Sequence, residues 1–501
     1  MGQRLREMGP RTLAAIAAVM CISIAIWNLE SARSGLSITQ LSVGSTPATV
    51  YRHAAGGSAP AVIIAHGFAG SRQFMESYAL TLARAGYVAV SFDFEGHGRN
   101  PTPMSGDITS IDGTTQLLMA EIGRVTDAAL ALPGVDGRVA LLGHSMASDI
   151  IVRRALSDPR IAATVAISMF SEAVTATQPR NLLIITGEWE TFLRTDALRN
   201  VRLAEPSADA GQTVGDPSKN TGRRAVVAPG VEHISVLYSA TALREARDWL
   251  NLVFDREDTQ PVPATGAMIV LLLVGIVVLA WPLAGLLPRG DTAPSRVPLR
   301  TFWLAVLVPA VLTPILLTVV DTRFLPVLVA DYLAVHLFVF GLLGLGILWR
   351  GKVRLGHIAW LSGLALAAYG ILVFGGALNR YAASFVPDLT RLPIILAIAM
   401  GAVPYMLADS LATEAGRAAL WRVLRARAAF LASLGIAVAF DVERLFFLLL
   451  IIPVIVVFFI IFGLMGGWVG RRTLSPSAPG IGLGLILAWA LGVSFPMFVS
   501  G

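Results

Sequence analysis

The stretch Leu141-Leu142-Gly143-His144-Ser145-Met146-Ala147 marks a place where an apolar strand should end and a helix begin. Gly143 and Ala147 are small, and small neighbours allow a tight turn that lifts the Ser145 hydroxyl clear of a sheet. The N-terminus of the following helix favours developing negative charge at the same point. The stretch therefore predicts an exposed nucleophile on a strand–turn–helix unit, although a serine that only caps a helix gives the same pattern.

Short β-rich apolar runs alternate with helical periodicity on both sides of this stretch, from residue 35 to about 258. Such alternation is typical of a parallel sheet wrapped by helices. We expect an α/β domain with eight strands, near Ser37–Val43, Ala48–His53, Ala61–Ala65, Val88–Phe92, Val139–Leu142, Ala163–Ile167, Leu182–Thr186 and Ala225–Ala228. Helices are expected between them, near Phe74–Ala85, Gly113–Ala131, Met146–Leu156 and Ala240–Phe254.

Two further turns follow predicted strands. His66-Gly67-Phe68-Ala69-Gly70 could expose backbone N–H groups, and Asp93-Phe94-Glu95-Gly96-His97-Gly98-Arg99 is a polar, glycine-rich turn one strand later. With these turns placed before the Ser145 turn, residues 37–255 resemble the α/β-hydrolase superfamily. Many of its members have a His-Gly turn after the third strand, an Asp-x-x-Gly-His-Gly turn after the fourth and a nucleophile turn after the fifth. The resemblance implies a mostly parallel sheet and hydrolase activity for this part of the chain.

The resemblance also implies an acid and then a histidine downstream of the serine. Glu190 lies three residues after Gly187, at the place where the family usually has its acid, and Glu188 and Asp196 remain alternatives. His233, after the last predicted strand, matches the family's general base.

The resulting assignment is a catalytic Ser145, His233 and Glu190, with the N–H groups of Phe68 and Met146 as the oxyanion hole. The two other histidines in turn motifs, His97 and His144, are expected to have structural roles.

The composition points to a membrane protein, because 55% of the 501 residues are hydrophobic and only 14% are charged. Residues 1–30 carry Arg4, Arg6 and Arg11 before an apolar run from Thr12 to Trp27, which is the layout of a signal anchor or of a cleaved signal peptide. We favour the uncleaved anchor. Residues 31–258 then form the α/β domain, and residues 259–501 a polytopic helical domain.

Eight apolar runs after Ala264 are each long enough to cross about 30 Å of hydrocarbon. They lie near residues 264–287, 301–320, 325–349, 356–378, 392–412, 427–441, 445–469 and 479–499. Arginine and lysine concentrate in alternate loops, and the positive-inside rule then puts residues 31–258 on the extracytoplasmic side of a cell membrane. We expect Asp409 to lie at a solvated helix end.

The net charge of +6 does not indicate a polyanion-binding face. Residues 259–501 hold 16 basic against 8 acidic residues, so the excess lies between apolar runs, where it reports topology. This distribution argues against nucleic-acid binding. Neither a phosphate-binding loop nor a zinc motif occurs, and the single cysteine, Cys21, forms no pair, so no cofactor or metal is expected.

The sequence therefore predicts a membrane-anchored serine hydrolase that cleaves an ester, thioester or amide. Only residues 169–180 separate the sixth and seventh strands, which leaves no room for a substantial lid. The site is then open to solvent, or covered by the helical domain or the bilayer, which would suit a lipid-like acyl substrate. An acyltransferase with the same residues, and a transporter or assembly factor with an inactive hydrolase-like domain, remain alternatives. The oligomeric state is not indicated.

Overall fold

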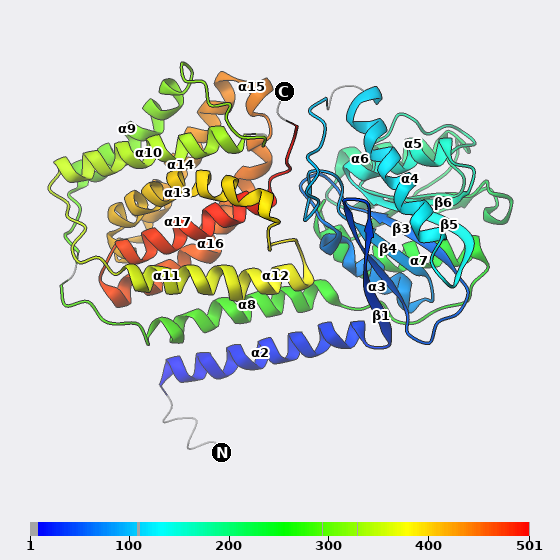
Figure 1. The fold of residues 1–501 in the computed structure, drawn as a ribbon, viewed down its shortest axis with the longest axis horizontal. Helices are drawn as coiled ribbons and strands as arrows, with labels where there is room; N and C mark the ends of the chain where they lie inside the picture. Colours follow the sequence, from blue (N-terminus) through cyan, green and yellow to red (C-terminus); the bar gives the residue numbers. More distant parts are fainter. Residues whose placement is uncertain (1–8, 108–110, 293, 328, 500–501) are drawn as a thin grey trace.

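The computed structural model describes residues 9–107, 111–292, 294–327 and 329–499. Two parts lie side by side in Figure 1, a set of long helices and an α/β part built on a twisted sheet. Arg4 and Arg6, which the sequence places before the first apolar run, lie outside the described residues.

The α/β part is built on one nine-stranded sheet in the order β1-β2-β4-β3-β5-β6-β7-β9-β8. β3, β4, β5, β6, β7 and β9 pair in parallel, whereas β1, β2 and β8 pair antiparallel. The strands are β1 (Leu36–Val43), β2 (Thr46–His53), β3 (Ala59–Ala65), β4 (Val88–Phe92), β5 (Val135–His144), β6 (Ile161–Ile167), β7 (Leu182–Gly187), β8 (Thr213–Val214) and β9 (Arg223–Ala228).

The mostly parallel α/β fold expected from the sequence is confirmed, but the strand number is not. Eight strands were expected and each coincides with an observed one; the ninth is β8, whose two residues are too few to give a periodic signal. It pairs with the first two residues of β9 at the edge of the sheet.

Helices cover both faces of the sheet, and the side chains along each strand pack alternately against the helices on one face and on the other. Val62 and Ile64 of β3 face α3 (Glu76–Arg84) and α7 (Ala240–Phe254), while Ile63 faces α4 (Gln116–Leu130) and α5 (Met146–Ser157). Successive side chains of a strand point to opposite faces, so a strand covered on both sides is apolar throughout. All seven residues of β3 are buried accordingly.

Nine helices in the described residues are long and apolar enough to cross a membrane, which suggests a multi-pass membrane protein. They are α2 (Pro10–Arg33), α8 (Thr265–Ala284), α9 (Leu299–Leu316), α10 (Ala330–Arg350), α11 to α12 (Trp360–Tyr381), η6 with α13 (Leu389–Ala412), α14 (Leu420–Phe440), α16 (Leu448–Thr473) and α17 (Ser477–Ser494).

The sixth C-terminal span was expected only at residues 427–441, and α14 begins earlier, at Leu420. The guanidinium of Arg425 lies over the Trp303 and Trp421 rings, and that of Arg427 lies over Phe459. Stacking on aromatic faces lets arginines occupy the start of a helix that the sequence pattern assigns to a loop.

The expected position of Asp409 is wrong. It is 7% exposed and lies 3.6 Å from the Arg427 guanidinium, so it is paired inside the helical part instead of solvated at a helix end.

The chain after α17 joins the two parts, as the dark red segment in Figure 1 shows. Met497 exchanges backbone hydrogen bonds with Gly96 and Met104, which belong to the turn and loop after β4. Arg391, at the start of α13, donates to the same Gly96 carbonyl at 2.9 Å. The segment after β4 is thus held directly against the helical part. Because parallel strands all end at one edge, this contact places the carboxyl edge of the sheet toward the helical part.

Candidate active site

Ser145 lies between β5 and α5 in a strained backbone conformation, with φ of 54° and ψ of −120°. A positive φ is uncommon for a residue with a Cβ, and such strain concentrates at functional sites. The turn needs small neighbours, since a Cβ on Gly143 would lie 2.9 Å from the Ala147 carbonyl oxygen. The strand, the turn and the small residues therefore form the strand–turn–helix unit that the sequence predicts around Ser145.

A hydrogen-bond chain runs from Ser145 through His233 to Glu190. The Ser145 Oγ lies 2.9 Å from His233 Nε2, and His233 Nδ1 lies 2.6 Å from Glu190 Oε1. The side chain of His233 is 41% exposed, whereas that of Glu190 is 5% exposed. Three residues that are far apart in the sequence are thus brought together with the acid inside and the imidazole at the surface.

Glu190 is held from a second side. Its Oε2 accepts hydrogen bonds from the Gly187 N–H at 2.6 Å and from the Ser168 hydroxyl at 2.8 Å. Burial alone would raise the pKa of Glu190, but the hydrogen bonds from His233, Gly187 and Ser168 outweigh burial and lower the pKa. The carboxylate is consequently ionised at neutral pH and its orientation is fixed.

The two alternative acids point elsewhere. Glu188 is exposed and accepts from the Gly230 N–H at 2.7 Å, so it holds the loop after β9. Asp196 lies on α6 (Thr191–Arg202), where it pairs with Arg199 and accepts from Asn200. Of the three carboxylates considered, Glu190 is the one that contacts His233.

The turn after β3 packs directly on the nucleophile. A Cβ on Gly67 would lie 2.9 Å from the Ser145 Cβ, so glycine is what allows the close approach. This places the backbone of Phe68 beside Ser145. Met146 is the first residue of α5, and its N–H is therefore one of the donors that a helix N-terminus leaves without an intrahelical partner.

Three buried histidines hold the turns around the site. His66 accepts from the Phe94 N–H at 3.1 Å, and its other ring nitrogen donates to the Gly67 carbonyl at 2.7 Å. Burial lowers the pKa of His97 and of His144 to about 3, so both rings are neutral. These positions agree with the structural roles expected for His97 and His144.

Sequence reasoning missed two positioning contacts. The ring of His144 donates from Nε2 to the His233 backbone carbonyl at 2.8 Å, and so fixes the segment that carries the imidazole. Ser168, directly after β6, holds Glu190 from a backbone with φ of 51°. The motif that contains His144 marked its position but not its partner, and the sequence around Ser168 has no pattern that would single it out.

Apolar side chains surround the site at the carboxyl edge. The Phe68 ring lies 5.0 Å from that of Phe447, which comes from the helical part at the start of α16. Farther along the edge, large apolar side chains near the site are exposed: Phe170, Trp189, Phe192 and Ile234, at 48%, 66%, 67% and 45%. The helical part therefore covers one side of the site and leaves an apolar rim on the other.

Within the described residues, no group of three or more His, Cys, Asp or Glu side chains is arranged to hold a metal ion.

Residues 57–195 match the family model of serine aminopeptidases, S33. Among solved structures, an epoxide hydrolase from Vigna radiata is 26% identical over 27% of this chain and 39% of its own, with a TM-score of 0.22. A hypothetical protein from Pseudomonas aeruginosa is 15% identical over 45% of this chain and 95% of its own, with a TM-score of 0.34. A hydrolase from Thermoplasma acidophilum is 14% identical over 43% and 97%, also with a TM-score of 0.34.

The match thus spans well under two thirds of the epoxide hydrolase's length. No curated protein sequence matches the chain. The family match covers β3 to the start of α6, and the strand order extends the same fold to β9. The part of the chain from β1 to α7 is an α/β-hydrolase domain, fused here to a domain of membrane-capable helices.

Proposed function

We propose that the protein is a serine hydrolase that forms an acyl-enzyme on Ser145. The observation that carries the proposal is the hydrogen-bond chain from Ser145 through His233 to the buried Glu190. A serine hydroxyl is a weak nucleophile, and a base within hydrogen-bond reach that is itself oriented by a third group activates it.

In this proposal, His233 Nε2 takes the hydroxyl proton as the Ser145 Oγ attacks the acyl carbon. Glu190 keeps the Nδ1 proton on the far side of the ring and stabilises the imidazolium that forms. The C–O, C–S or C–N bond to the leaving group then breaks, and His233 returns the proton to that group. Water activated by the same imidazole releases the acid and restores Ser145.

The oxyanion of each tetrahedral intermediate would be held by the N–H groups of Phe68 and Met146. Removal of one such donor typically costs a factor of about 10² to 10³ in kcat. The close packing of Gly67 on Ser145 supports this assignment, since it brings the turn that carries Phe68 next to the attacking oxygen.

We further propose that the acyl substrate is carried by the bilayer on the extracytoplasmic side. The turns after β3 and β4 touch the helical part, so the carboxyl edge that holds Ser145 faces the side where the membrane surface would lie. The exposed rings of Trp189 and Phe192 lie at that edge, and aromatic side chains favour the membrane–water interface. An amphiphilic ester or thioester would then reach Ser145 from the lipid.

The test compares two ester substrates on the full-length protein in liposomes, one short and water-soluble and one long-chain and anchored in the bilayer. Ser145→Ala should abolish turnover of both. The double variant Trp189→Ala and Phe192→Ala should lower turnover of the anchored ester about thirtyfold while leaving the soluble ester within about twofold. Each aromatic ring that enters the membrane interface contributes about 1 kcal/mol, and about 2 kcal/mol corresponds to about thirtyfold.

Undiminished hydrolysis by Ser145→Ala would refute the assignment of the nucleophile. Equal losses on both esters in the double variant would refute the bilayer as the source of substrate, while leaving the hydrolase proposal intact.

A further inference from the structure

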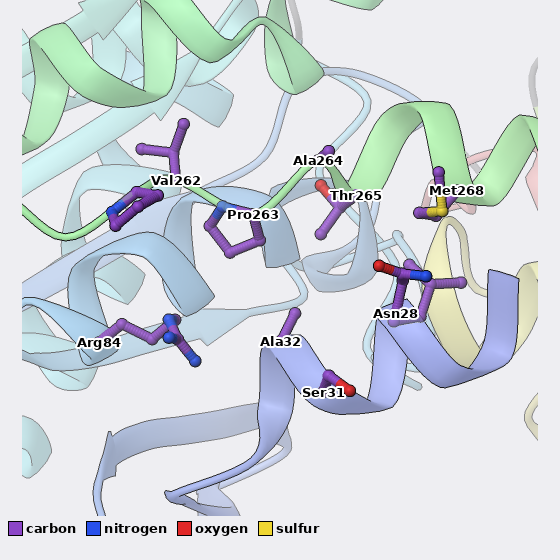
Figure 2. Close-up of a pocket in the computed structure, with 11 residues that line it drawn as sticks. Asn28, Ser31, Ala32, Arg84, Val262, Pro263, Ala264, Thr265 and Met268 are labelled. Carbon is purple, nitrogen blue, oxygen red and sulfur yellow. The ribbon is translucent and has the colours of Figure 1, made fainter. Parts of the chain in front are cut away.

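A pocket of about 280 Å³ lies away from Ser145, where the ends of α2 and α8 meet α3 and the linker that joins α7 to α8. Figure 2 shows the side chains that line it. Its polar lining residues are Asn28, Ser31, Arg84 and Thr265, and the rest of the wall is apolar. The volume is close to the lower end of the range for small-ligand sites, so it suits a compact head group and not a whole lipid.

The charge of Arg84 is not neutralised by the protein. In the described part of the chain no Asp or Glu pairs with Arg84, and its Nε is buried without a hydrogen-bond partner. In Figure 2 the Arg84 side chain extends from the end of α3 in the direction of Ala32. A partly buried cation with an unsatisfied donor lowers the stability of the fold unless an anion binds to it.

Neighbouring charges at the same level do have partners. Arg33 pairs with Glu76, and Glu30 pairs with Arg380 at 2.9 Å. Arg84 therefore differs from Arg33 and Arg380, and the difference coincides with the pocket.

Helices that span a bilayer end near the level of the phospholipid phosphates, and the pocket lies at the ends of two membrane-capable helices. Asn28 and Ser31 belong to the last two turns of α2, and Thr265 is the first residue of α8, so the polar wall marks the ends of two membrane-capable helices. Met268 continues the wall by one turn from Thr265 toward the apolar middle of α8. A group that is anionic at one end and apolar at the other matches this order of side chains.

We propose that this pocket binds the phosphate of a membrane phospholipid, with Arg84 as its counter-charge. The Ser31 hydroxyl is a further donor, and the Asn28 amide, which gives one hydrogen to the Ile24 carbonyl at 2.8 Å, has a second to offer. The acyl chains lie beside Met268 along α2 and α8. The Thr265 hydroxyl is already bonded to Ser77 at 2.7 Å, so it shapes the wall. The bound lipid fastens the hydrolase domain to the bilayer at a point separate from Ser145, so the proposal does not rest on the catalytic one.

The test is native mass spectrometry of the full-length protein in mild detergent, titrated with dioleoylphosphatidylglycerol. Arg84→Gln should bind the first lipid about fivefold more weakly than wild type, the loss expected for one arginine at a lipid surface. The matched control is Arg244→Gln, which removes the same charge from an exposed position on α7. Equal binding by Arg84→Gln and wild type would overturn the proposal.

Two further experiments identify the source of the phosphate and keep the proposal testable if the Arg84→Gln variant does not fold. Inorganic phosphate at the same concentration should not displace the lipid, because it lacks the apolar contacts, and displacement at equal potency would show that the pocket is a free-phosphate site. On wild type, a photoactivatable phosphatidylglycerol should crosslink within residues 28–32 or 261–268, and crosslinks confined to other segments would contradict the proposal. Unchanged fluorophosphonate labelling of Arg84→Gln separates this result from the fate of the catalytic proposal.

Discussion

Replacing Glu190 by glutamine tests the orientation of His233, and the structure determines how the amide would sit. Oε2 of Glu190 accepts from two donors, the Gly187 N–H and the Ser168 hydroxyl. A glutamine side chain has one acceptor oxygen, and that oxygen is needed where the two donors converge. The NH₂ group of the glutamine must then face His233 Nδ1, so Nδ1 becomes an acceptor and the ring proton moves to Nε2. Nε2 then donates toward Ser145 and can no longer accept the proton of its hydroxyl.

The wrong tautomer removes the general base without disturbing the fold. We expect kcat for a soluble ester to fall about 10⁴-fold, as for loss of the triad carboxylate in serine proteases. This equals a rise in the activation free energy of about 5.4 kcal/mol, at 1.36 kcal/mol for each factor of ten.

The assay is steady-state hydrolysis of a p-nitrophenyl ester by the full-length protein in detergent, with thermal unfolding measured for every variant. The matched control is Glu188→Gln. The carboxylate of Glu188 is exposed and, within the described residues, bonds only to the N–H of Gly230, so kcat of this variant should stay within about threefold of wild type. A loss smaller than tenfold in Glu190→Gln, or a larger loss in Glu188→Gln, would refute the reasoning.

Three other outcomes follow from the same structure. Ser168→Ala should lower kcat about tenfold or more, the usual effect of losing one hydrogen bond to a charged group, and should shift the pH profile of kcat, which a purely structural change would not. Burial raises the pKa of Glu121 to about 7, so the folded state keeps a proton that the unfolded state has lost, and stability falls as pH rises from about 4.5 to 7. Glu121→Gln should remove up to about 3 kcal/mol of this loss, which would appear as a smaller drop in melting temperature between pH 5 and 7.5. An unchanged drop would contradict the prediction. A reporter active only in the cytoplasm should be silent after Asp258 and active after Arg296, and the reverse would place the hydrolase domain inside the cell.

The sheet and its turns could be predicted because each carries a local signal. β3 is a continuous apolar run that ends at His66-Gly67, and the turn at Ser145 needs small residues that are visible in the sequence. The features that were missed lack such signals. β8 has two residues, and α14 begins with arginines whose stacking on Trp303 and Phe459 depends on other helices.

The same distinction applies within the site. Glu190 could be placed by its spacing from Gly187. The contact of the Ser168 hydroxyl with Oε2 of Glu190 could not, because it depends on the pairing of β6 with β7. The covering of Phe68 by Phe447 joins residues nearly four hundred positions apart, and no periodicity reports a contact of that kind.

The central claim is that Ser145 becomes covalently acylated, and the most direct test is to locate the adduct. The full-length protein is treated with a fluorophosphonate and digested with trypsin, which releases the peptide Val139–Arg153 with two serines, Ser145 and Ser148. Fragmentation should place the adduct on Ser145 alone, and Ser145→Ala should carry none. An adduct on Ser148 or in another peptide, or an unmodified Val139–Arg153 in active wild-type protein, would contradict the account.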